Sequence, residues 1–163
     1  MSKGRRIFRQ LAVEIASDFL DHIHNAYDYA VVCGSVRRMK DTVGDLDIVI
    51  VPKTNNKMSK ALIMVFGRDS RIGKYRDTDI QLVPCMDFEI GAAVLYATGS
   101  SKFNLYMRAV AKSKNLLLNR NGLWRRDKTE LLASSSEEAI FKALGMKYIE
   151  PEGRNEYYQS SWS

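Results

Sequence analysis

The chain of 163 residues is 45% hydrophobic and 27% charged, which excludes an intrinsically disordered protein and fits one compact domain or two small lobes. Its two cysteines form no CxxC pair and have no histidine at metal-ligand spacing, which argues against a disulfide framework and a zinc site. The net charge is +6, and the basic residues concentrate in 1–9 and 99–128, a distribution that favours a polyanionic partner over a neutral one.

The first half of the chain alternates between helical and strand patterns. Apolar residues at helical spacing predict an amphipathic helix over 6–25. Because Glu14 and Asp18 interrupt its apolar residues, this segment is not a secretory signal, and no apolar run is long enough to span a membrane. We therefore expect an intracellular protein. Buried strands are predicted at 29–33, 46–51 and 78–83, a loop or helix entry at 53–60, and either a helix or a strand at 61–66.

The second half begins with two helices, 88–97 and 102–114, separated by a break at Thr98–Gly99, with Ser100 or Ser101 as the cap of the second. Asn-Gly at 121–122 predicts a hairpin of 116–118 with 123–124, followed by a short strand at 131–133. A capping box of Ser134 with Glu137, or Ser135 with Glu138, starts a helix over 137–144 that stops at Gly145. This order predicts an α+β fold, with a mixed sheet covered by helices on one face over 1–98 and a small α/β lobe over 99–163.

The most informative stretch runs from Gly34-Ser35-Val36-Arg37-Arg38 to Gly44-Asp45-Leu46-Asp47. Asp45 and Asp47 are two residues apart at the start of a strand, so both carboxylates point to one face of the sheet. Two adjacent carboxylates repel each other unless a cation lies between them, and oxygen ligands suit Mg²⁺. The pair therefore predicts a metal site.

The residues around this pair predict phosphate chemistry. Ser35 follows a strand, and Arg38 offers a charge-assisted fork, so both can hold a phosphate. Asp79, in the alternating run 77–83, supplies the third carboxylate of a two-metal site, with Asp77 as the fallback. A lone pair of aspartates is usually an ordinary strand-edge feature, but the combined pattern indicates phosphoryl or nucleotidyl transfer.

The residues resemble the polymerase beta type of nucleotidyltransferase, and more narrowly the family X DNA polymerases. The narrower match covers most of the chain, from about 27 to 155. Its downstream residues are Leu95-Tyr96-Ala97-Thr98-Gly99-Ser100, Phe103-Asn104, Met107-Arg108, Asn119, Glu138-Ala139-Ile140-Phe141, Gly145 and Lys147-Tyr148-Ile149-Glu150-Pro151.

The resemblance implies a catalytic palm over 1–98 and a nucleotide- and DNA-binding lobe over 99–163. It implies that Asp45, Asp47 and Asp79 bind two Mg²⁺ ions, for which Mn²⁺ may substitute, and that Asp79 helps to activate a primer 3′-hydroxyl. The nucleotide-binding residues that it implies are Gly34, Ser35, Arg38, Gly44, Tyr96, Ala97, Gly99 and Asn104. The DNA-binding residues expected from it and from the basic blocks are Arg108, Lys102, Lys112, Asn119, Arg120, Arg5 and Arg6.

Three departures from the family pattern carry expectations. About 30 residues precede the motif, so we expect no N-terminal lyase or helix-hairpin-helix domain, a layout similar to the minimal polymerase of a large DNA virus. Ala97 stands where an aromatic residue is common, which predicts weaker exclusion of ribonucleotides. Gln81 stands where many relatives have arginine, which removes an ion-pair partner of the carboxylates.

The resulting hypothesis is a DNA-directed DNA polymerase that adds dNTPs to a primer in short gaps during DNA repair. We expect a monomer that binds gapped or primer-template DNA, works with a DNA ligase and, if viral, acts in the host cytoplasm or nucleus. The alternatives are a template-independent transferase, a transferase for small molecules, RNA or protein, and a non-catalytic nucleic-acid-binding module. The intact aspartates argue against the last of these, and the basic 99–128 block argues against a small-molecule substrate.

Overall fold

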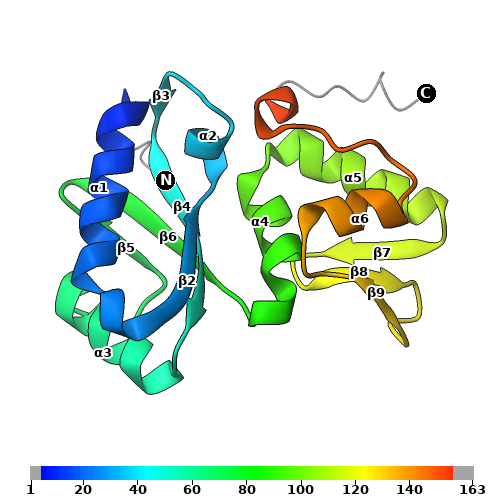
Figure 1. Ribbon diagram of the computed structural model, residues 1–163. Coiled ribbons are helices and arrows are strands. Elements are labelled where there is room, and N and C mark those ends of the chain that lie inside the picture. Colours follow the sequence, from blue (N-terminus) through cyan, green and yellow to red (C-terminus); the bar gives the residue numbers. More distant parts are fainter. Residues whose placement is uncertain (1–4, 156–163) are drawn as a thin grey trace. The chain divides into compact units, whose positions relative to one another are not determined.

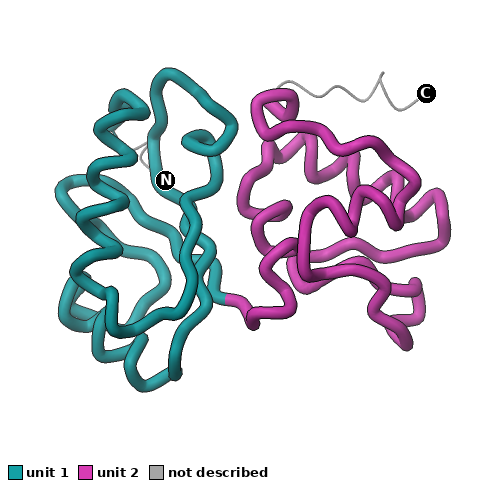
Figure 2. Tube along the Cα trace, viewed as in Figure 1, with its two compact units in different colours: residues 1–84 teal, residues 85–163 magenta. Residues whose placement is uncertain are grey.

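The computed structural model describes residues 5–155, so Lys3 of the N-terminal basic block and the tail after Asn155 lie outside the described part. The chain divides into two compact units, Met1–Pro84 and Cys85–Ser163 (Figure 2). Each unit has its own hydrophobic core.

The first unit is built on a mixed four-stranded sheet in the order β2-β4-β6-β5 (Figure 1). Its strands are β2 (Tyr27–Val32), β4 (Asp45–Pro52), β5 (Ile72–Tyr75) and β6 (Thr78–Pro84). The central pair, β4 and β6, is parallel, and both flanking pairs are antiparallel. The predicted strands are confirmed, whereas β5 was not predicted, because its sequence Ile-Gly-Lys-Tyr is short and contains glycine.

Two helices cover one face of this sheet, α1 (Arg9–His22) and α3 (Asn55–Phe66). Phe19 of α1 stacks on Phe66 of α3 with the ring centroids 5.5 Å apart. Alternate residues of the two central strands, Leu46 and Ile48 of β4 and Ile80 and Leu82 of β6, are buried in the same core. The other alternate positions point away from the helices, and these include the aspartates at the start of each strand.

The ambiguous segment 61–66 is helical because it belongs to α3, which begins further upstream. Thr54 caps this helix by accepting a hydrogen bond from Lys57 N at 3.1 Å. Gly67 ends it in the left-handed conformation with φ +77°, which costs glycine little. The polar stretch 53–60 is therefore the start of a helix, the second of its two predicted forms.

The N-terminal helix is shorter than predicted because the residues before it form a strand. Ile7 and Phe8 make up β1, which pairs with β3 (Thr42–Val43) in a separate two-stranded sheet. The helix then starts at Arg9 instead of residue 6. A one-turn helix, α2 (Gly34–Arg37), completes the first unit. A strand of two residues is too short to show periodicity, so the sequence pattern predicted helix for residues 6–8.

The second unit packs helices against an antiparallel sheet in the order β7-β8-β9. Its elements are η2 (Asp87–Glu89), α4 (Ile90–Thr98), α5 (Ser101–Ser113), β7 (Leu116–Asn119), β8 (Gly122–Arg125), β9 (Leu131–Ala133), α6 (Glu137–Ala143) and η3 (Pro151–Arg154). The predicted hairpin and third strand are confirmed. The two predicted folds, a mixed sheet with helices on one face and a small α/β lobe, are thus both present.

The division between the units falls earlier than the predicted boundary at Thr98–Gly99. Helix α4 belongs to the second unit because Ala92 and Leu95 lie in its core and Ala92 N donates to Ser134 O at 3.0 Å. A side chain at Gly91 would collide with the backbone of Ser136, so this helix packs closely against the start of α6. The break at Thr98–Gly99 separates two helices of one unit.

The structure shows which serines cap α5 and α6. Ser100 caps α5 by accepting a hydrogen bond from Phe103 N at 3.3 Å. Ser136 caps α6 through Ala139 N at 3.1 Å, so the predicted capping boxes of Ser134 and Ser135 are wrong. The reason lies in tertiary contacts, because the Ser134 hydroxyl donates to Phe88 O at 2.6 Å.

A fully buried arginine holds the end of the described chain to the second core. Arg154 Nη1 lies 2.6 Å from Glu137 Oε2, and Nε and Nη2 donate to Ile149 O at 2.9 and 2.7 Å. The guanidinium is enclosed by three aromatic rings, those of Phe103, Phe141 and Tyr148, at 5.2 to 5.5 Å from their centroids. The only regular element within residues 145–154 is the short helix η3. The contacts of Arg154 therefore hold this segment in place where no strand pairing does.

We predict that Arg154→Met destabilises the second unit by about 3–5 kcal/mol, because it leaves the Glu137 carboxylate buried without its cation. The double variant Arg154→Met with Glu137→Gln should recover part of this loss, since it removes the uncompensated charge. Urea unfolding followed by circular dichroism measures both. A loss below about 1 kcal/mol for Arg154→Met would contradict the proposed importance of this pair.

Candidate active site

The two central strands of the first unit bring the three predicted carboxylates together. In the parallel register, Asp45 of β4 lies directly opposite Asp79 of β6, and Asp47 lies opposite Gln81. Residues opposite each other in register point to the same face, and so do Asp45 and Asp47, which are two apart. All three aspartates therefore lie on the sheet face opposite α1 and α3. The fallback residue, Asp77, lies outside this ladder in the β5–β6 turn with φ +60°.

Among residues 5–155, no three His, Cys, Asp or Glu side chains gather closely enough to form a ready metal centre. The third carboxylate is engaged elsewhere, because Asp79 Oδ1 lies 3.5 Å from Lys74 Nζ on the neighbouring strand β5. Three unscreened carboxylates repel one another, which favours such an arrangement. The donor set is nevertheless all oxygen, and its three members share one sheet face. This chemistry fits Mg²⁺ better than Zn²⁺.

Burial makes Asp47 the most perturbed of these acids. Its pKa is raised to about 6, first by loss of solvent and then by the Asp45 carboxylate, against the opposing effect of Arg38. The pKa of Arg38 is lowered by burial, although Asp47 and Asp45 both act to raise it. The guanidinium and the two carboxylates thus form one coupled group with more negative than positive charge. Such a site has a deficit of positive charge that a cation can fill.

The glycine of the GS motif is required by the Asp47 side chain. Gly34 adopts φ +60°, and a Cβ at this position would collide with the Asp47 carboxylate. The preceding residue, Cys33, donates its N–H to Asp47 O at 2.7 Å and continues the β2–β4 pairing up to this point. The backbone of α2 therefore passes directly over Asp47 of β4, where only glycine fits.

Ser35 and Arg38 lie side by side at this position. Arg38 Nη2 donates to Ser35 Oγ at 3.2 Å, and both side chains are half-buried. Arg38 is coupled electrostatically to Asp47, so the predicted phosphate-binding pair adjoins the predicted metal ligands. Among residues 5–155, an added Cβ at Gly44 would meet only Arg6 Nη1, at 3.6 Å, so packing against these residues does not require glycine there.

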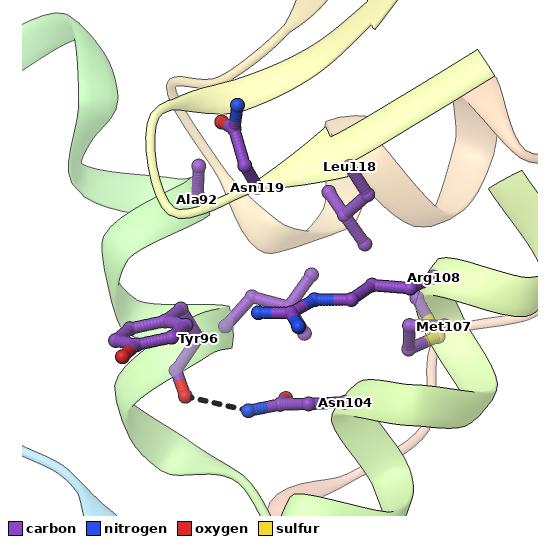
Figure 3. Close-up of a pocket in the computed structure, with 8 residues that line it drawn as sticks. Ala92, Tyr96, Asn104, Met107, Arg108, Leu118 and Asn119 are labelled. Carbon is purple, nitrogen blue, oxygen red and sulfur yellow. Dashed lines mark hydrogen bonds between the residues drawn. The ribbon is translucent and has the colours of Figure 1, made fainter.

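Two predicted nucleotide residues, Tyr96 and Asn104, and two predicted DNA contacts, Arg108 and Asn119, line a small pocket between α4, α5 and β7 (Figure 3). Its free volume is about 10 Å³, which makes it a slot instead of a nucleotide-sized cavity. The exposed Tyr96 forms one side, and the Arg108 side chain extends along the slot towards it (Figure 3). The lining residues are Ala92, Leu95, Tyr96, Asn104, Met107, Arg108, Leu118 and Asn119.

Two asparagines of this pocket have structural bonds that the sequence did not reveal. Asn104 Nδ2 donates to Tyr96 O at 2.9 Å, which ties α5 to the end of α4 and directs its Oδ1 away from that bond. Asn119 Oδ1 accepts from Asn121 N, Gly122 N and Trp124 Nε1 at 2.9 to 3.3 Å. This oxygen therefore organises the β7–β8 turn, and only the amide NH₂ group of Asn119 is left for a ligand.

The remaining predicted nucleotide and DNA residues are distributed over both units. Ala97, in the last turn of α4, is half-buried, and Gly99 follows that helix with φ +67°. In the first unit, Arg5 is exposed, whereas Arg6 donates to Thr42 Oγ1 and Thr42 O. Four of the predicted DNA contacts in the second unit have exposed side chains, Lys102, Arg108, Lys112 and Arg120.

The structure adds residues that the sequence analysis did not single out. Lys74 reaches Asp79 because β5 pairs antiparallel with β6, and Thr42 receives the Arg6 guanidinium because β1 pairs with β3. Arg76 and Asp77 form the turn between β5 and β6, and this turn was the sequence signal that could have predicted the β5–β6 pairing. Strands of two residues provide no such signal for the second.

The fold defines a class, an α+β protein with a mixed sheet covered by helices in its first unit and a small α/β second unit, consistent with a polymerase beta-like fragment. A family model for the DNA polymerase beta thumb matches residues 93–155, which lie wholly within that second unit. The chain is 29% identical to DNA polymerase lambda of Rattus norvegicus over 164 residues, which cover 77% of this chain and 28% of that protein.

Two further relatives match about half of the chain. DNA polymerase IV of Saccharomyces cerevisiae is 41% identical over 71 residues, or 44% of this chain and 12% of that protein. DNA nucleotidylexotransferase of Eulemur macaco is 39% identical over 77 residues, or 47% of this chain and 15% of that protein. The chain is thus similar to family X DNA polymerases, its residues 93–155 match the polymerase beta thumb model, and it spans less than a third of the length of each of these relatives. Within the described residues, no helix has the length and apolar character to cross a membrane.

We predict that Asp47→Asn stabilises the metal-free protein at pH 8 by about 1–3 kcal/mol. In the native fold the pKa of Asp47 is raised from 3.8 to about 6, so its contribution to stability is present below about pH 4 and is lost as the pH rises through 6. The neutral amide avoids this loss. The gain should therefore shrink to near zero at pH 4.

Urea unfolding in EDTA at pH 4 and pH 8 measures this effect, with Asp28→Asn on the exposed side of β2 as the matched control. The control removes the same charge from a solvated position, so its stability should stay within about 0.5 kcal/mol of wild type. An Asp47→Asn variant that is less stable than wild type at pH 8 would contradict the assigned desolvation.

Proposed function

We propose that this protein is a DNA-directed DNA polymerase that adds dNTPs to a primer 3′-hydroxyl, with short-gap filling in DNA repair as its role. The observation that carries the proposal is the placement of Asp45, Asp47 and Asp79 on one sheet face beside the Gly34-Ser35 turn. The thumb match of the second unit supports a nucleic-acid substrate over a small molecule.

In this proposal Asp45 and Asp47 hold two Mg²⁺ ions, or Mn²⁺ in their place, and Asp79 completes the site after its side chain leaves Lys74. When bound, the ions lower the pKa of the attacking hydroxyl and neutralise charge on the triphosphate. Asp79 orients the primer 3′-hydroxyl and accepts its proton, and attack on the α-phosphate releases pyrophosphate. Ser35 and Arg38 bind the non-transferred phosphates, and Gly44 leaves backbone room beside them.

The second unit would bind the nucleoside and the template. Tyr96, Ala97 and Gly99 line the sugar and base, and Asn104 presents its Oδ1 to the minor-groove edge because its Nδ2 is held by Tyr96 O. Arg108 and Asn119 contact the template strand, and Lys102, Lys112, Arg120 and Arg5 contact the phosphate backbone. The partners in this proposal are gapped or primer-template DNA, the dNTP and a DNA ligase, and the protein acts as a monomer. A viral source and a host-cell compartment remain part of the same proposal.

Primer extension tests this function directly. Each dNTP is offered with Mg²⁺ on three substrates, a one-nucleotide gapped duplex, an open primer-template and a single-stranded primer. We expect templated insertion that is strongest in the gap, and loss of at least about 10³-fold activity in Asp45→Ala and Asp47→Ala because the charge-neutralising site is removed. Asp28→Ala, an exposed acid on β2, is the control and should keep wild-type activity.

One alternative has a specific observation in its favour. The similarity to DNA nucleotidylexotransferase of Eulemur macaco favours template-independent addition to single strands. In the same experiment, extension of the single-stranded primer without a template would support this alternative. Absence of incorporation on all three DNA substrates would redirect the proposal to transfer onto a small molecule, RNA or protein.

The size of Ala97 generates a prediction on sugar selection. The Ala97 methyl group is smaller than an aromatic ring and leaves more space beside the sugar. The wild type should therefore discriminate weakly between rNTPs and dNTPs. Ala97→Phe should raise the dNTP preference roughly tenfold or more by steric exclusion of the 2′-hydroxyl. Single-turnover insertion of each nucleotide measures it, and equal discrimination by both proteins would contradict this role of Ala97.

A further inference from the structure

The loop of residues 39–44 joins the two ends of the candidate site. Arg38, at the end of α2, precedes it, and Asp45, the first residue of β4, follows it. Its only regular structure is the two-residue strand β3. Because a two-residue strand has little stability of its own, whatever holds this loop sets the position of Asp45 relative to the phosphate-binding residues.

The N-terminal segment 6–9 contacts the loop at several successive points. Ile7 pairs with Val43 and Phe8 with Thr42 in the antiparallel β1–β3 ladder. Arg9 N donates to Asp41 O at 3.0 Å. Ile7 and Val43 are also buried in the core of the first unit, with exposed fractions of 7% and 0%. The segment is therefore anchored in the core and lies along the loop like a strap.

Arg6 makes the contact that is nearest to the metal-binding turn. Its Nε donates to Thr42 Oγ1 at 3.1 Å, and its Nη2 donates to Thr42 O at 2.7 Å. The third guanidinium nitrogen, Nη1, lies over Gly44, 3.6 Å from where a Cβ of that residue would be. All three nitrogens of the planar fork thus face the turn 42–44, which ends at Asp45.

We propose that Arg6 is a positioning residue for the metal site, a role that rests on the proposed function. Its guanidinium holds the turn 42–44 in the geometry that places Asp45 beside Asp47 and Asp79, before DNA or nucleotide binds. This differs from the expectation that Arg6 is a DNA contact, because two of the three guanidinium nitrogens of this exposed side chain already donate to Thr42. A lysine keeps the positive charge but cannot donate from a planar fork, so charge alone does not fulfil the role.

Mn²⁺ binding, measured by electron paramagnetic resonance without DNA or nucleotide, tests the proposal. We expect Arg6→Ala and Arg6→Lys to raise the Kd for Mn²⁺ by roughly threefold to tenfold, in line with losses seen when groups that orient metal ligands are removed. Thr42→Val, which removes one of the two acceptors, should give a smaller increase. Arg71→Ala is the matched control, since it removes an exposed arginine of the same unit, just before β5, and should leave the Kd unchanged.

The outcomes separate the possible roles of this arginine. Wild-type Mn²⁺ affinity in Arg6→Lys and Arg6→Ala, with weaker binding of DNA, would overturn the positioning role and restore the DNA contact. If Arg6→Ala unfolds, Arg6→Lys and Thr42→Val decide the question, because both keep Ile7 and the β1–β3 ladder. If the Asp45→Asn variant binds Mn²⁺ as tightly as the wild type, the proposed function is refuted, and the positioning role of Arg6 with it.

Discussion

Repulsion between carboxylates that share one sheet face is the constraint around which the first unit is arranged. Asp45, Asp47 and Asp79 come together only because β4 and β6 are parallel neighbours in one particular register, and that pairing is buried on the other face by α1 and α3. Burial first and the neighbouring Asp45 carboxylate second raise the pKa of Asp47, and Asp79 forms an ion pair with Lys74. The rigid apolar core therefore holds charges that would otherwise separate.

The segments around this strand pair are shaped to support it. Gly34 lets the backbone of α2 pass over Asp47, and Arg38 supplies positive charge without neutralising both aspartates. The strap of residues 6–9 holds the loop that leads into Asp45. These contacts leave the candidate site with more negative than positive charge, which is the state that the proposed cation-dependent transfer would require before substrates bind.

The second unit depends on a different interaction. Arg154, buried between aromatic rings and paired with Glu137, fastens a segment of little regular structure to α5 and α6. The thumb family model covers residues 93–155, so it ends at this arginine's neighbour and begins inside α4. The structural division at Pro84–Cys85 places all of α4 with the thumb, which explains why the break at Thr98–Gly99 is a turn within a unit and not a boundary.

The sequence by itself determined the α+β class, most of the longer elements and the candidate site residues. The alternating residues of β6 and the helical spacing of α1 and α5 reflect which face of each element is buried, and this information is local. The Gly34-Ser35 and Asp45-Leu46-Asp47 motifs are likewise local. Asp79 followed from its place in an alternating run, but its position opposite Asp45 rests on a parallel register that no local pattern encodes.

Tertiary structure alone decided the features that depend on distant partners. The start of α1 at Arg9 follows from the pairing of Ile7 and Phe8 with residues more than thirty positions away, and the Ser136 cap follows from the engagement of Ser134 by Phe88 O. The bonds of Arg6 and Lys74 depend on short strands, whose formation depends on neighbours in space. Hydrogen bonds and burial are satisfied globally, so short segments take the conformation that the surrounding core permits.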